Sequence, residues 1–142
     1  MLQQAHDRIL VSTPGQGFTD LTGQVAGWLK RIGADAGLAT LFVRHTSASL
    51  TIQENADPDV QRDLLAALDR AAPRTARYHH RSEGPDDMPA HIRSMLTATS
   101  LSIPVLDAKA VLGTWQAIYL VEHRDQGHDR EVALHFLGTL KS

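Results

Sequence analysis

The chain of 142 residues contains no cysteine, which excludes a thiol nucleophile, a cysteine-ligated metal site and a disulfide framework. No segment approaches the roughly 18 consecutive apolar residues of a membrane-spanning helix. The first residues turn polar too early for a signal peptide, so we expect a cytoplasmic protein with no membrane partner. Lys and Arg number 14 against 16 Asp and Glu, and this net charge of −2 argues against a nucleic-acid partner.

What remains is an ordinary globular composition with one unusual count. Hydrophobic residues make up 42% of the chain and charged residues 21%, which predicts a single folded domain over residues 1–142. Histidine occurs 8 times. Because neutral imidazole is the commonest metal ligand and a carrier of protons, the histidines are the first place to look for a site.

The hydrophobic pattern predicts an α+β fold, a sandwich-like core of mostly antiparallel or mixed β-sheet with about three helices. One helix follows Asp20 and ends at Gly33, a second begins at the Asp57-Pro58 pair, and a third begins near Pro89. The expected strands cover residues 7–12, one or two segments within 38–53, and residues 99–106, 110–122 and 131–137. Asp107–Lys109 has the character of a hairpin turn.

The first candidate site is the run from Arg44 to Ser49, at the end of an expected strand. His45, Thr46 and Ser47 offer an imidazole and two hydroxyl groups that suit a metal or a phosphate. The alternative is a half-buried strand end whose hydroxyls satisfy the backbone of a turn.

The second candidate is the polar loop 74–88 with the helix start that follows it. His80, His91, Glu83 and Asp87 fall within this stretch. Zinc takes three or four nitrogen or oxygen ligands, whereas Mg²⁺ prefers carboxylates and water. His79 precedes His80 directly, so in an extended segment only one of the two faces a site. The alternative is a solvated acidic loop in which Asp87 caps the helix.

The third candidate is the charged segment 122–130, which the pattern places in a hairpin loop between two apolar strands. Arg124 and Arg130 would form a bidentate clamp on phosphate. The alternative, in which these charges pair with one another in solvent, is favoured on the sequence alone. His123 is interpreted as a bystander, and Trp115 as a core or interface anchor.

Three stretches, HTSASLTIQENADPDV, EGPDDMPAHIRS and LGTWQAIYLVEHR, occur in this order and together resemble the YjbQ-like family over nearly the whole chain. The resemblance implies a compact α+β subunit that assembles as a homotrimer, with the activity of a secondary thiamine-phosphate synthase. The sequence departs from the family pattern at Gln53, where Asn is usual, and at Ala98 and Ala108, where Gly is expected. The family's recurrent polar positions fall on His45, Thr46, Ser47, Glu54, Asn55, Asp57, His80, Glu83, Asp87, His91, Glu122, Arg124 and Arg130.

From this resemblance and the chemistry of the side chains we expect a divalent metal, zinc or Mg²⁺, on His45, His80 and His91. His45, Glu83, Asp87 and His91 would act in catalysis. An anionic substrate would contact Thr46, Ser47, Asn55, Arg124 and Arg130.

The leading reaction is condensation of a pyrimidine diphosphate with a thiazole phosphate, with release of pyrophosphate. Departure of pyrophosphate usually recruits Mg²⁺ through carboxylates, whereas three histidines suit zinc. Two alternatives therefore stay open. One is a metal-dependent hydrolase of a phosphorylated small molecule, and the other is a non-catalytic trimeric protein that binds a metal or ligand.

Overall fold

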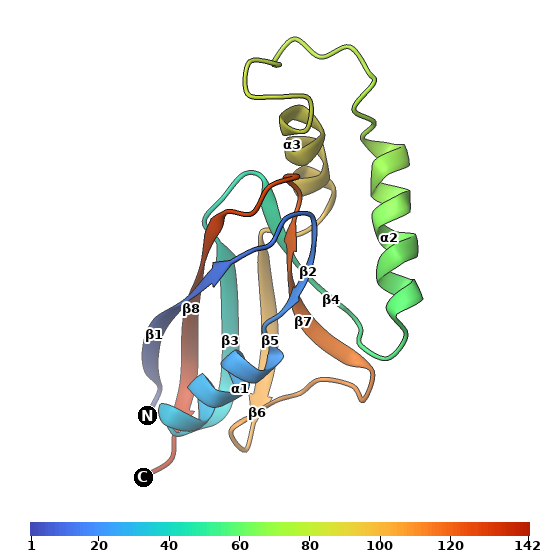
Figure 1. Cartoon of the computed structure of the whole chain (residues 1–142). Helices are drawn as coiled ribbons and strands as arrows, with labels where there is room; N and C mark the ends of the chain where they lie inside the picture. The colour runs from blue at the N-terminus through green and yellow to red at the C-terminus, as the bar shows by residue number, and fades with distance from the viewer.

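Two antiparallel β-sheets and three α-helices build the protein, and the computed structural model describes all of residues 1–142 (Figure 1). The larger sheet has the strand order β1 (Gln3–Ser12), β8 (Asp129–Leu140), β3 (Ala34–Val43), β5 (Ser100–Leu106) and β6 (Lys109–Ala110). The smaller sheet has the order β2 (Gly17–Asp20), β7 (Gln116–Glu122) and β4 (Ala48–Glu54). The α+β class expected from the sequence is confirmed.

The hydrophobic core fills the space between the inner faces of the two sheets. Alternate residues of the larger sheet point inward, among them Leu41 of β3 and Phe136 of β8, and they meet Leu50 and Leu120 of the smaller sheet. Helix α1 (Thr22–Arg31) closes one side of this core with Trp28, which is fully buried. The core therefore draws on both sheets and one helix, as a single domain requires.

The segment predicted as one strand over residues 110–122 divides in two, so that prediction is wrong in extent. Residues 109–110 pair with β5 across a tight turn, as the expected hairpin at Asp107–Lys109 requires. Asp107 and Ala108 both have positive φ angles, 53° and 65°, the conformation of the tightest hairpin turns. After residues 111–115 the chain enters the other sheet as β7, which is buried on both faces.

Helix α2 (Pro58–Ala71) begins where the sequence predicts, because Asp57 accepts a hydrogen bond from the amide of Asp59 at 2.9 Å and Pro58 occupies the first turn. No side chain of α2 is fully buried. Its apolar stripe, with Leu64 and Leu68, lies across the outer side of the smaller sheet and leaves a cavity of about 300 Å³ beneath the helix.

A long loop connects α2 with helix α3 (Asp87–Leu96) and rises above the end of the sheets in Figure 1. Arg93 of α3 holds the two helices together. Its buried guanidinium group donates to Asp69 of α2 at 2.7 Å and to the carbonyl of Ala72 at 3.2 Å. None of the three helices combines the length and the hydrophobicity that a membrane-spanning helix needs. The cytoplasmic location stays a prediction.

Candidate metal centre

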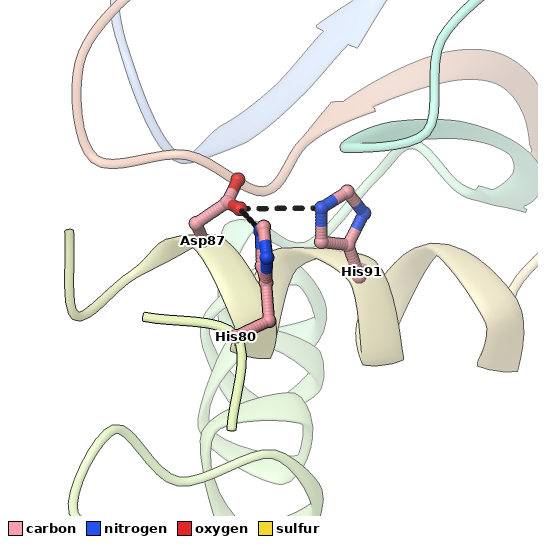
Figure 2. Close-up of side chains that lie close together, drawn as sticks. All are labelled: His80, Asp87 and His91. Carbon is pink, nitrogen blue, oxygen red and sulfur yellow. Dashed lines mark hydrogen bonds and ion pairs between the residues drawn. The ribbon is translucent and has the colours of Figure 1, made fainter. Parts of the chain in front are cut away.

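Two histidines and one aspartate converge where the long loop meets α3 (Figure 2). His80 comes from the loop, Asp87 begins α3, and His91 lies one helical turn further along the same face. One ligand atom from each residue lies within 4.8 Å of the others. Asp87 is 3% exposed, whereas His80 and His91 are 48% and 33% exposed, so the cluster is reached from solvent on its histidine side.

Hydrogen bonding fixes the orientation of the His91 ring. Its Nδ1 lies 2.9 Å from the carbonyl oxygen of Thr46, which can only accept, so Nδ1 carries a proton. Nε2 of the neutral ring then directs its lone pair at the carboxylate oxygen of Asp87, 3.2 Å away. Two acceptors face each other across this gap unless a proton or a cation lies between them. Histidine ligands of metals commonly donate their other ring N–H to a backbone carbonyl in this way.

His80 completes the cluster by donating from Nε2 to the same oxygen of Asp87 at 2.7 Å. Loss of this proton would turn Nε2 into a third ligand atom beside the oxygen of Asp87 and Nε2 of His91. Two imidazoles and one carboxylate are a donor set typical of zinc and of other first-row transition ions. The chemistry of the residues present therefore fits a divalent metal ion.

Arg124 holds the acidic side of the cluster in place. Its guanidinium group donates to Asp86 at 2.9 Å, to the second oxygen of Asp87 at 3.0 Å and to the carbonyl of Glu83 at 3.0 Å. The hydrogen bond from Arg124 lowers the pKa of Asp86, and the same contact raises the pKa of Arg124. With its donors turned toward these groups, Arg124 positions the loop, and its role as a phosphate ligand stays a prediction.

Arg130 is also turned away from solvent. It is 5% exposed and forms a bidentate ion pair with Glu122, including a contact of 2.8 Å from Nε, and it donates to the hydroxyl of Ser47 at 3.0 Å. Burial raises the pKa of Glu122, but hydrogen bonds from Arg130 and Thr13 outweigh it and leave the pKa below its usual value. Each of the two arginines of the predicted phosphate clamp is thus engaged by carboxylates within the subunit, and the clamp itself stays a prediction.

The structure brings some of the other expected residues to the cluster and leaves others apart. Thr46 contributes its backbone carbonyl, and Glu83 contributes only its carbonyl, through Arg124. His45 is turned toward β8, where its Nε2 accepts a hydrogen bond of 2.8 Å from the amide of Glu131. Burial, followed by the charge of Arg130, lowers the pKa of His45. Asn55 follows the far end of β4 and is not part of this cluster.

His123 and Trp115 lie in environments that differ from those expected from the sequence. His123 is fully buried, and its Nε2 lies 2.8 Å from the hydroxyl of Ser49. Its Nδ1 has no hydrogen-bond partner. Segment 122–130 is not a hairpin loop, since β7 and β8 belong to different sheets, and this crossing is what buries His123. Trp115 is 63% exposed and is not a core residue.

Comparison with known proteins finds a consistent set of relatives. A family model described as UPF0047 protein YjbQ-like matches residues 7–139. A UPF0047 protein of Synechocystis is 46% identical over 139 residues, which is 97% of this chain and 95% of the relative. The UPF0047 protein YjbQ of Salmonella typhimurium is 41% identical over 125 residues, covering 87% of this chain and 91% of the relative.

Solved structures agree with the sequence relatives. A YbjQ-like protein of unknown function from Sulfolobus solfataricus superposes with a TM-score of 0.90 at 26% identity, covering 98% of this chain and 100% of the other. An uncharacterised conserved protein of the YjbQ/UPF0047 family from Clostridium acetobutylicum gives a TM-score of 0.84 at 37% identity, covering 92% of this chain and 98% of the other. The names of these relatives carry no activity.

Proposed function

The chain belongs to the UPF0047 YjbQ-like family, and on that premise we propose that it is a metal-dependent hydrolase of a phosphorylated small molecule. His80, Asp87 and His91 would hold the metal ion. The observation that carries this proposal is the position of His91 Nε2, which lies 3.2 Å from the Asp87 carboxylate while Nδ1 is hydrogen-bonded to the carbonyl of Thr46. A cation bound between His91 Nε2 and the Asp87 carboxylate would satisfy both acceptor atoms.

The composition of the cluster favours a transition ion over Mg²⁺. Asp87 is the only carboxylate in the cluster. When bound with an open position, zinc supplies an activated water for hydrolysis. The protein's own contribution is to hold the ligands: Arg124 orients Asp87 through one oxygen, and the Thr46 carbonyl orients His91.

Thiamine-phosphate synthase activity, which the resemblance implies, is the second candidate. The carboxylate of Asp87 is a ligand that Mg²⁺ also accepts, and Mg²⁺ suits the departure of pyrophosphate. The two candidates differ in their requirements, because a synthase consumes two organic substrates and a hydrolase consumes one substrate and water. A protein that binds metal and turns over neither kind of substrate would be the non-catalytic binder.

Metal content measured by mass spectrometry tests the cluster directly. The wild type is purified without added metal. When it is then titrated with zinc in competition with a chelating dye, it should bind one ion per chain. His91→Ala should weaken this binding at least a hundredfold. His79→Ala removes a histidine from the same loop outside the cluster and should bind like the wild type, as should His45→Gln.

Activity then separates the candidates. Release of inorganic phosphate from a panel of phosphate monoesters by the zinc-loaded protein, lost in His91→Ala, would support the hydrolase. Formation of thiamine phosphate from its two precursors with Mg²⁺ would support the synthase instead. A wild type that binds no divalent ion, or a His91→Ala variant that keeps it, would refute the metal site.

We also propose that the subunits assemble as a homotrimer through the outer face of the larger sheet. Leu38, Phe42 and Leu137 lie on this face and are 43%, 49% and 48% exposed, an unusual apolar content for a surface in water. Light scattering on the eluting protein should give three times the subunit mass of 15.5 kDa. Phe42→Glu should yield the single-subunit mass, whereas a wild-type monomer would refute the assembly.

A further inference from the structure

Two arginines of the loop between α2 and α3 stand out because they have no partner. Every arginine of the chain except Arg70, Arg77 and Arg81 forms an ion pair with a carboxylate. Arg77 and Arg81 also make no hydrogen bond from their side chains, and both line the same cavity of about 400 Å³. In a protein of net charge −2, two free guanidinium groups at one cavity are a local excess of positive charge.

The rest of the cavity wall adds to that charge and does not neutralise it. Arg74 is a third arginine of the lining, although it is paired with Asp125 outside the lining. No carboxylate lines the cavity. Tyr78 supplies an apolar surface, and its hydroxyl is turned away to donate to the carbonyl of Pro73 at 2.6 Å. The cavity therefore presents uncompensated donors to an anion.

The cavity adjoins the metal cluster through a shared residue. His80 is a member of the cluster and is also part of the cavity wall. Figure 2 shows His80 reaching from the loop toward Asp87 at the start of α3. A group held in the cavity thus lies next to the ligands of the proposed metal, which is where the charged end of a substrate belongs.

We propose that Arg77 and Arg81 form the anion subsite of the protein and bind the phosphate or diphosphate group of a small-molecule substrate. The location of this subsite beside a metal ion rests on the proposed function. In this proposal Arg77 and Arg81 take the place of Arg124 and Arg130 as the phosphate ligands. Guanidinium groups match phosphate because their planar N–H donors contact two oxygens at once. Arg124 and Arg130 cannot do this while they are bound to Asp86, Asp87 and Glu122.

The test uses inorganic phosphate and inorganic pyrophosphate as probes on the metal-free full-length chain, with binding measured by calorimetry at fixed ionic strength. Pyrophosphate should bind once per chain. The double variant Arg77→Gln, Arg81→Gln should bind it at least tenfold more weakly. Arg70→Gln is the matched control, because Arg70 is exposed and unpaired but does not line the cavity, and it should stay within twofold of the wild type.

The subsite would be overturned if the wild type bound neither probe at millimolar concentration, or if the double variant kept wild-type affinity. An equal loss in Arg70→Gln would also overturn it, since the effect would then be that of net charge. Zinc titration tests the metal site independently of the anion subsite, because the double variant should bind zinc with the affinity of the wild type. Anion binding without zinc binding would retain this subsite and refute the hydrolase.

Discussion

Replacing His123 with glutamine should remove a large part of the acid sensitivity of the fold. His123 is fully buried, directly after β7 and beside Ser49 of β4. Burial, followed by the positive charges of Arg93 and Arg130, lowers the pKa of His123 from 6.5 to about 4, while Glu122 acts in the opposite direction. A proton on this ring in the folded protein would be buried near two arginines, so the folded state keeps His123 neutral.

The sign of the effect follows from proton linkage. The unfolded chain takes up a proton on His123 near pH 6.5, and the folded protein does so only near pH 4. Stability from this group is therefore complete above pH 6.5, falls as the pH drops from 6.5 to 4, and is lost below pH 4. Since one pKa unit corresponds to about 1.4 kcal/mol, the whole loss is about 3 kcal/mol. About 2 kcal/mol of it falls between pH 7 and pH 4.5.

Urea denaturation followed by circular dichroism, in the presence of a chelator, measures this difference. Between pH 7 and pH 4.5 the free energy of unfolding should fall by about 2 kcal/mol more in the wild type than in His123→Gln. Glutamine can still form a hydrogen bond with Ser49 but does not titrate. His128→Gln, a change at an exposed histidine of the same connection, should keep the wild-type dependence. If the free energy of unfolding falls equally with pH in the wild type and in His123→Gln, His123 is not a source of the acid sensitivity.

Three further outcomes follow from other contacts. Arg124→Gln should weaken zinc binding about 10- to 100-fold in the dye competition, because Asp87 loses the donor that orients it; an unchanged affinity would contradict this role. Gly37→Ala should lower the free energy of unfolding in urea by about 3 kcal/mol, since the new Cβ would lie 2.3 Å from the carbonyl oxygen of Leu137; a loss below about 1 kcal/mol would mean that the strands can separate. Asp57→Ala should cost about 1 kcal/mol in the same assay through loss of the cap of α2, and no change would show that the cap is replaceable.

Local features of the sequence predicted the helices and the centre of the site. The cap and the proline at Asp57-Pro58 specify the start of α2 without help from the rest of the chain. His91 follows Asp87 by four residues, so any helix beginning near Asp87 places both on one face. His80 lies in the connecting loop close to that helix start, and so all three members of the cluster were among the candidates.

The family resemblance identified the polar positions of the site but did not determine the direction of each side chain. His45 is directed at β8 and not at His80 and His91, because the end of β3 and the turn after it fix the direction of the ring. The spacing of Arg124 and Arg130 is equally uninformative about their partners, which come from residues before α3 and at the end of β7.

The pairing of strands is what only the tertiary structure decided. The sequence alone determined that the chain combines short strands with three helices, one of them with a clear cap, and that Asp87 and His91 stand at helical spacing, because these are properties of neighbouring residues. Whether β7 joins β8 or β4 depends on contacts between segments far apart in the chain. That choice buries Glu122, His123 and Arg130, since burial depends on what lies across the interface and not on the residue itself.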